Sequence, residues 1–166
     1  MAAFFIYIHM NTPSQRIDAK AVKAWRISGS LYILPFALGF IPLYIFVDEI
    51  QSVPFIELYA MVVVLLFFML VFPLSKIRWQ RWHYEINEQE IDLLRGIIVK
   101  KRTLIPMNRI QHVDNRQGPI YKAFKLSSVS VSTAATTHEI PALDDETAEQ
   151  VRHNISAFVT QAKEDV

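Results

Sequence analysis

The chain has 166 residues, of which 52% are hydrophobic and 20% charged, and its mean hydropathy is positive at +0.22. This composition is too apolar for an ordinary soluble domain. The sequence contains no cysteine, which excludes disulfides, thiolate zinc sites and cysteine nucleophiles. The net charge of +1 conceals an asymmetry, because residues 76–125 are basic whereas residues 139–165 are acidic.

The first nine residues are apolar but too short to span a bilayer, and they lack the basic region and cleavage site of a signal peptide. A peripheral anchor is one interpretation, but we favour a mis-assigned start, with translation beginning at Met10. The polar residues that follow carry four cations against the single carboxylate Asp18. This composition is typical of a cytoplasmic flank.

Residues 28–47 and 55–74 form two apolar runs, each about as long as a membrane-spanning helix requires. The first run has no charge and the second has only Glu57. Apolar residues occupy all sides of both helices, which favours a bilayer over the alternative of a buried hairpin in a soluble complex. Pro35 and Pro42 lie on nearly one face of the first run and should bend it, and ordinary packing explains them better than a gating role.

The connector between the two runs, residues 48–54, is acidic and lacks Lys and Arg, whereas basic residues flank both open ends of the hairpin. The positive-inside rule therefore places both termini in the cytoplasm. Trp25, Trp79 and Trp82 lie where interfacial anchors are expected. The sequence thus predicts three parts: a cytoplasmic N-terminal segment (1–27), a transmembrane hairpin (28–75) and a cytoplasmic domain (76–166).

From Trp82 onward the pattern changes to the alternation that is typical of β-strands. Strands are predicted at residues 82–86, 91–95, 97–105, 109–116, 128–133 and 138–143, with a short helix near 120–124. After Asp144 and Asp145, apolar residues recur at spacings of 3, 4, 3 and 4, at Ala148, Val151, Ile155, Phe158 and Ala162. The pattern predicts a small antiparallel sandwich or barrel that one C-terminal helix closes.

Particular segments carry a family resemblance. The most specific is IPMNRIQHVD at 105–114 followed by RQGP at 116–119, and LRGI at 94–97 and AWRI at 24–27 extend it over nearly the whole chain. These segments resemble bacterial membrane proteins with a pleckstrin-homology-like domain, specifically the YdbS family. The resemblance implies a two-helix transmembrane hairpin followed by an α+β, mainly-β pleckstrin-homology-like barrel of about seven strands with a C-terminal helix.

The chain departs from this family at two loops. Lys125 stands where the family usually has a glycine, and residues 134–137 lack a glycine that is common there. These departures bear on the loop conformations and leave the expected fold unchanged.

The resemblance also carries expectations about function. It implies a location in the bacterial cytoplasmic membrane and no enzymatic activity, because the family has no established catalytic residues. No cofactor is expected. Members often occur beside a larger membrane protein with repeated domains of the same kind. We therefore expect the partners to be the lipid bilayer and either such a relative or a second copy of this chain.

The densest charge cluster is Lys100, Lys101 and Arg102. These residues are candidates for contact with anionic lipid, because each cation near the membrane surface contributes about 1 kcal/mol. A solvated strand end fits the same residues equally well. A phosphoinositide site is not expected, because the first hairpin turn, residues 87–89, is not basic.

Other groupings have simpler explanations than a catalytic or metal site. His112 and Asp114 would share a strand face, and His138 and Glu139 could be added to them, but this spacing does not demand a metal. The serines in one alternating stretch lack a nucleophile-elbow sequence and are expected to form the outer face of a strand: Ser127, Ser128, Ser130 and Ser132.

The sequence also has no glycine-rich phosphate loop and no nucleic-acid-binding module, so neither a nucleotide nor a nucleic acid is expected as a partner. Three hypotheses follow. The leading one is a membrane-anchored, non-catalytic binding or assembly module, the second is an anionic-lipid-sensing module of the inner leaflet, and the remote third is a membrane enzyme.

Overall fold

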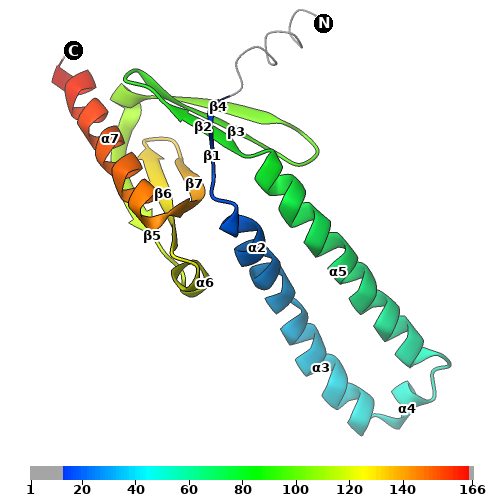
Figure 1. Ribbon diagram of the computed structural model, residues 1–166. Helices are drawn as coiled ribbons and strands as arrows, with labels where there is room; N and C mark the ends of the chain where they lie inside the picture. The colour runs from blue at the N-terminus through cyan, green and yellow to red at the C-terminus, as the bar shows by residue number, and fades with distance from the viewer. Residues whose placement is uncertain (1–12, 165–166) are drawn as a thin grey trace, which may run out of the picture.

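The computed structural model describes residues 13–164, so the predicted start at Met10 lies outside the described residues. Figure 1 shows a long two-helix arm joined to a domain of two sheets and one long helix. In chain order the elements are β1 (Gln15–Arg16), α2 (Lys20–Leu31), α3 (Ile33–Phe46), α4 (Asp48–Gln51), α5 (Ile56–Gln80), β2 (His83–Ile86), β3 (Glu90–Arg95), β4 (Lys101–Pro106), η1 (Met107–Arg109), β5 (Ile110–Arg116), α6 (Pro119–Ala123), β6 (Leu126–Thr133), β7 (Thr137–Asp144) and α7 (Asp145–Glu164).

The arm consists of the two predicted apolar helices. Lys20–Phe46, which comprises α2 and α3, has 27 residues, and Ile56–Gln80 has 25, so both are long and apolar enough to cross a membrane. No residue of α3, all of which the structure describes, is buried, and Ser75 is the one buried residue of α5. Such a continuous apolar surface fits a lipid solvent and would be costly in water.

The domain contains two antiparallel sheets with strand orders β1-β2-β3-β4 and β5-β6-β7. Its core combines Ile91 and Leu93 of β3 with Val129 of β6, Ile140 of β7 and Ile155 of α7, all 0% exposed. The long helix α7 packs against the second sheet and η1. The expected fold class is confirmed: two apolar helices precede a mainly-β domain that a C-terminal helix closes.

The N-terminal segment also contributes to the domain, which sequence analysis did not predict. Gln15 and Arg16 pair with β2 as an additional edge strand. Ile17, Ala21 and Ala24 are 2%, 0% and 0% exposed and belong to the same hydrophobic core. A two-residue strand is too short to produce a periodic pattern, so alternation along the sequence could not reveal it.

The predicted strand at 97–105 was wrong in its first half, because β4 begins at Lys101 and residues 96–100 form the turn between β3 and β4. Gly96 has a backbone φ of +126°, a value that residues with a Cβ atom rarely adopt. A Cβ atom placed on it would lie 1.9 Å from the carbonyl oxygen of Val99. The backbone therefore folds back on Gly96 at this point, and the apolar run could not continue as a strand.

The serines of β6 also required a correction. Ser128 and Ser130 alternate with Val129 and Val131 as expected, but they are only 2% and 1% exposed. Helix α6 packs on β6, and α2 packs in turn on α6. The serine face of β6 is therefore covered by other elements at Ser128 and Ser130, whereas Ser132, near the end of the strand, is half-buried.

Lys125, at the position where the family usually has a glycine, takes a positive φ of 54°. Left-handed backbone costs a residue with a Cβ atom about 1 kcal/mol. The lysine therefore keeps the glycine-like turn between α6 and β6, and the departure noted in the sequence does not alter the fold.

Candidate functional site

The domain is fixed to the arm through a set of contacts that we call the joint, made by α2, the end of α5, α6 and β7. The indole Nε1 of Trp25 donates a hydrogen bond to the hydroxyl of Tyr121 over 2.9 Å. The guanidinium of Arg78 lies 4.2 Å from the centre of the Trp25 ring. Nε1 of Trp79 donates to the carbonyl oxygen of Ile17 over 3.0 Å. These contacts join residues from both ends of the hairpin to the domain.

Polar contacts at the start of α2 extend the joint to β7. The amine of Lys20 lies 2.9 Å from a carboxylate oxygen of Asp144, and the backbone N–H of Asp18 donates to the carbonyl of Ala142 over 3.0 Å. The hydrogen bond from Lys20 lowers the pKa of Asp144 and raises that of Lys20. Both groups are therefore charged at neutral pH, which favours the contact.

The three predicted interfacial tryptophans differ in their surroundings. Trp25 and Trp79 are half-buried in the joint, whereas Trp82 is 4% exposed and lies in the domain core. A buried indole has almost no surface to offer to lipid. The anchoring role therefore stays a prediction, and the geometry favours Trp25 and Trp79 over Trp82.

The predicted basic cluster is divided by the fold. Arg102 binds Asp92 through three hydrogen bonds, two from Nε over 2.9 and 3.1 Å and one from Nη2 over 2.6 Å, and the Asp92 side chain is 6% exposed. Lys100 lies exposed in the turn at 96–100, and Lys101 is exposed at the start of β4. Arg102 therefore compensates a buried carboxylate, while the two lysines face outward.

The turn at 96–100, which we call the hairpin tip, also exposes two aliphatic side chains. Ile98 is 92% exposed and Val99 is 77% exposed. A guanidinium nitrogen of Arg81, which follows directly after α5, donates a hydrogen bond to the carbonyl oxygen of Ile97. The tip is therefore tied to the domain end of α5, beside which Figure 1 shows it.

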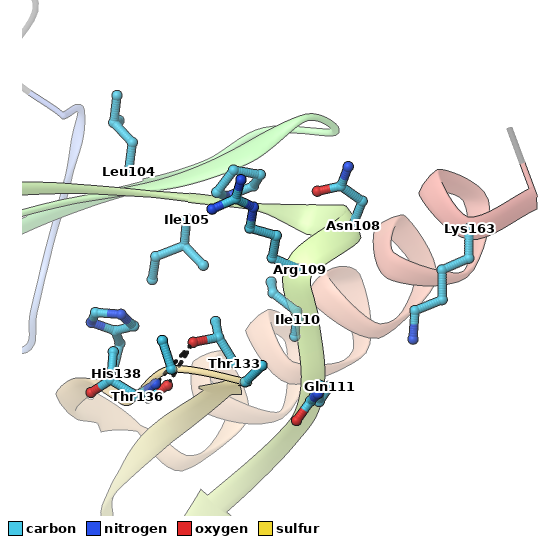
Figure 2. Close-up of a pocket in the computed structure, with 13 residues that line it drawn as sticks. Leu104, Ile105, Asn108, Arg109, Ile110, Gln111, Thr133, Thr136, His138 and Lys163 are labelled. Carbon is cyan, nitrogen blue, oxygen red and sulfur yellow. Dashed lines mark hydrogen bonds between the residues drawn. The ribbon is translucent and has the colours of Figure 1, made fainter. Parts of the chain in front are cut away.

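A cavity of about 600 Å³ opens at the other end of β4. Figure 2 shows that its walls come from β4, η1, β5, the facing ends of β6 and β7 with the turn between them, and α7. Apolar side chains form part of the wall and polar side chains the rest: Leu104, Ile105, Pro106, Ile110, Ala134 and Ala135, with Asn108, Arg109, Gln111, Thr133, Thr136, His138 and Lys163. The cavity suits a ligand with apolar and polar parts.

The charge of this cavity is positive. Arg109 and Lys163 line it, and among the described residues of its wall there is no Asp or Glu. Burial lowers the pKa of His138, and the cations Arg95 and Lys101 lower it further, so this imidazole is neutral at pH 7. The cavity therefore favours an anionic group, which Arg109 and Lys163 could bind.

Sequence analysis did not find this cavity. Its walls are assembled from segments between residues 104 and 163, and only the long-range fold brings them together. The one signal in the sequence that could have indicated the cavity is the segment 105–114, which carries the family resemblance most specifically and contains Arg109.

The residues considered for a metal site are separated in the structure. His112 and Asp114 are exposed on β5, whereas His138 lines the cavity. Within residues 13–164, no three His, Asp or Glu side chains come together in a group that could hold a metal ion.

Comparison with known proteins gives one family match. The family model described as "Bacterial PH domain", where PH stands for pleckstrin homology, matches residues 33–159. The match covers α3 and α5 as well as every strand after them and most of α7. No solved structure matches the chain.

Two curated relatives come from Bacillus subtilis (strain 168). The UPF0699 transmembrane protein YdbS is 47% identical over 96 residues, which cover 58% of this chain and 60% of the relative. The UPF0699 transmembrane protein YdbT is 26% identical over 125 residues, which cover 73% of this chain and 25% of the relative. The matched regions thus span less than two thirds of either relative.

Proposed function

This chain belongs to the bacterial PH domain family, and on that premise we propose that it is a membrane-anchored, non-catalytic module that binds another membrane protein or a second copy of itself. The family match confirms the resemblance found in the sequence. The chain is a membrane protein with a PH-like domain: a relative that is 47% identical is named a transmembrane protein, and two helices are apolar enough to cross a bilayer.

In the proposed arrangement, residues 1–27 and 76–166 lie in the cytoplasm and residues 28–75 form the hairpin in the cytoplasmic membrane. The charge pattern supports this orientation, because the connector between α3 and α5 lacks Lys and Arg while Lys76, Arg78 and Arg81 follow the second run. An alkaline phosphatase fused after residue 164 should be inactive, since this enzyme matures only after export. An active fusion would contradict the orientation.

The observation that carries the binding role is the cationic cavity. The joint holds the domain on the arm through both α2 and α5, so the cavity keeps a fixed place relative to the membrane. The cavity opens beside β4, which ends the first sheet, and β5, which begins the second. Edge strands offer backbone N–H and C=O groups for pairing with an extended peptide. Arg109 and Lys163 would attract an acidic residue of that peptide.

The non-catalytic part of the proposal rests on what the family and its relatives are called. The family description names a domain, and the names of both relatives state a membrane location without naming a reaction. The cavity adds support, because the residues that line it suit recognition of an anionic partner.

Crosslinking in native membranes tests the proposed partner. A photo-crosslinking amino acid at Ala135, in the cavity wall, should form an adduct with a membrane protein or with a second copy of the chain. The adduct should weaken when Arg109 and Lys163 are both changed to Glu, and these residues are exposed enough to be changed without unfolding the domain.

The matched control places the same amino acid at Lys122, which is exposed on α6 and outside the cavity. The proposal predicts no equivalent adduct there. The same adducts from Ala135 and Lys122, or none from Ala135, would contradict the assignment of the cavity as the binding site.

Contact with anionic lipid is a second candidate function, because Lys100 and Lys101 remain exposed near the domain end of α5. Arg102 contributes less to this candidate, since its guanidinium already binds Asp92. The hairpin tip lies before β4 and the cavity wall begins at Leu104, about 10 Å beyond Lys101 at the strand rise per residue. The two candidate roles are therefore separable by mutation.

A further inference from the structure

The hairpin tip exposes apolar surface that the proposed protein contact does not use. Among the described residues outside Lys20–Gln80, the exposed large apolar side chains are Ile98, Val99 and Leu104, and the first two are the most exposed. Each aliphatic side chain gains about 1.5–3 kcal/mol when it moves fully from water into an apolar environment. Two such side chains side by side therefore indicate a contact that is made outside the isolated chain.

The shape of the tip is fixed by its backbone. The positive φ of Gly96 lets the Val99 carbonyl approach the place that a Cβ atom would occupy. A guanidinium nitrogen of Arg81 donates a hydrogen bond to the carbonyl oxygen of Ile97. Ile98 and Val99 are therefore presented outward by a supported turn.

The tip also lies close to the expected layer of the lipid head groups. The predicted apolar run of the second helix ends at Leu74, and α5 continues to Gln80. The seven residue steps from Leu74 to Arg81 rise about 10 Å along the helix. The head-group layer is about 5–8 Å thick on each side of the hydrocarbon. Because Arg81 contacts Ile97, side chains that extend from the tip can reach this layer.

The charges around the tip suit an anionic surface. Lys100 and Lys101 are exposed beside the two aliphatic residues, and Arg78, Arg95 and Lys101 line a shallow depression next to the tip. Glu139 lines the same depression and is the one carboxylate among its described residues. The excess of cations around the tip favours binding of anionic groups. Lipid phosphates are the anionic groups expected here, because the tip lies next to the end of α5 and therefore close to the membrane.

We infer that the hairpin tip inserts into the leaflet from which α5 emerges, with Ile98 and Val99 in the head-group layer and Lys100 and Lys101 at the phosphates of anionic phospholipids. The insertion is a second attachment of the domain to the membrane, in addition to the joint. It rests on the second candidate function and deepens it by adding the two aliphatic residues, and it requires no protein partner and does not involve the cavity.

The chain contains no cysteine, so a single introduced cysteine can carry an environment-sensitive fluorophore. The full chain is labelled at Val99→Cys and reconstituted into nanodiscs of phosphatidylcholine with phosphatidylglycerol. The matched control is Glu88→Cys, in the exposed turn between β2 and β3 at the other end of the same sheet. Emission from position 99 should shift to shorter wavelength and be quenched by nitroxide-labelled lipid, whereas emission from position 88 should not.

The lysines provide a second measurement. Each of Lys100→Gln and Lys101→Gln should lower the ratio of inserted to free tip about fivefold in anionic nanodiscs. High salt should reduce the inserted fraction of the parent, because it screens exposed charges. These variants leave the core untouched, since both lysines are exposed.

Two outcomes would overturn the inference. One is a label at position 99 that behaves like the label at position 88 and is quenched from the aqueous phase. The other is a wavelength shift that disappears when each nanodisc holds a single copy of the chain, which would assign the tip to contact between copies. If the crosslink at Ala135 does not form but the signal at position 99 is as expected, the proposed protein partner is contradicted and the insertion of the tip is supported.

Discussion

The arm and the domain use the same apolar residue types in opposite ways. Leu65 of α5 is 64% exposed and Phe46 of α3 is 83% exposed. In the domain, Leu93, Ile140 and Ile155 are 0% exposed. The apolar side chains of the arm need lipid around them, whereas those of the domain are shielded from water by packing against one another. The difference shows that one chain is adapted to two solvents.

Helix α2 contains the boundary between these two regimes. Ala21 and Ala24 are fully buried in the domain core, whereas Ile27 and Leu31 are 45% and 47% exposed. The change takes place within one helical turn, directly before residue 28, where the first apolar run of the sequence begins. The helix therefore links the domain to the arm without a flexible linker between them.

Substitution of Ile155 should have the largest effect on the stability of the domain, because this residue lies at the centre of the domain core. Ile155→Asp buries an unpaired charge and should unfold the domain, at a cost above about 4 kcal/mol. Phe158→Asp should cost less, since Phe158 is half-buried. Thermal unfolding followed by circular dichroism in detergent measures both.

Matched truncations sharpen this contrast between core and arm. Ile155→Ala should cost about 2–5 kcal/mol, as for other large-to-small core changes. Leu65→Ala, on the exposed surface of α5, should leave domain unfolding unchanged. If Ile155→Asp proves as stable as the parent, α7 does not close the core.

Removal of Arg102 should have the next largest effect and should distinguish it from its basic neighbours. Arg102→Ala leaves the carboxylate of Asp92 buried without this partner and should cost about 2–3 kcal/mol, below the cost for a fully buried pair because the Arg102 side chain is 30% exposed. Lys100→Ala should change the stability by less than about 0.5 kcal/mol. Equal effects would mean that the three basic residues do act as one exposed cluster.

Loss of the Tyr121 hydroxyl should have a smaller effect that is confined to the joint. Tyr121→Phe removes the acceptor of the Trp25 indole and should cost about 1 kcal/mol. Hydrogen exchange of α2 should become faster while the exchange of β6 stays slow. Tyr59→Phe is the control, because Tyr59 is 62% exposed on α5 and far along the chain from the joint. Faster exchange throughout the domain would contradict a local role.

The smallest expected effect is a pH dependence from two histidines of the domain. Burial lowers the pKa of His83 and of His138 from 6.5, and nearby cations lower both further: Arg16 for His83, and Arg95 and Lys101 for His138. The folded chain therefore holds fewer protons on these rings than the unfolded chain. Their contribution to stability is present above pH 6.5 and is lost as the pH falls through the folded pKa values.

The unfolding midpoint of the domain should therefore decrease on acidification from pH 7 to about pH 5, before carboxylates begin to protonate near their ordinary pKa of about 4. Replacement of both rings, His83→Gln with His138→Gln, should flatten the curve in this window. A midpoint that rises between pH 7 and 5 would contradict the sign of the shifts.

Local patterns along the sequence determined most of the elements. The two apolar runs, the alternating strands and the 3-4 spacing of apolar residues in α7 all arise from side chains within a few residues of one another. The order of elements followed from these patterns, whereas the pleckstrin-homology-like fold class came from the family resemblance, which the segment 105–119 carries most specifically. Prediction failed where a turn interrupts an apolar run, as at Gly96, because the conformation of that glycine depends on Val99 folding over it.

Only the tertiary structure decided how these elements serve a site. The pairing of Arg16 with His83, of Trp25 with Tyr121 and of Lys20 with Asp144 joins residues that are 67, 96 and 124 positions apart. No local spacing encodes such contacts. The same holds for Arg102, which the sequence groups with two lysines but the fold commits to Asp92. Local order predicts which face of an element is apolar, whereas the partner that covers this face is set by the packing of the whole chain.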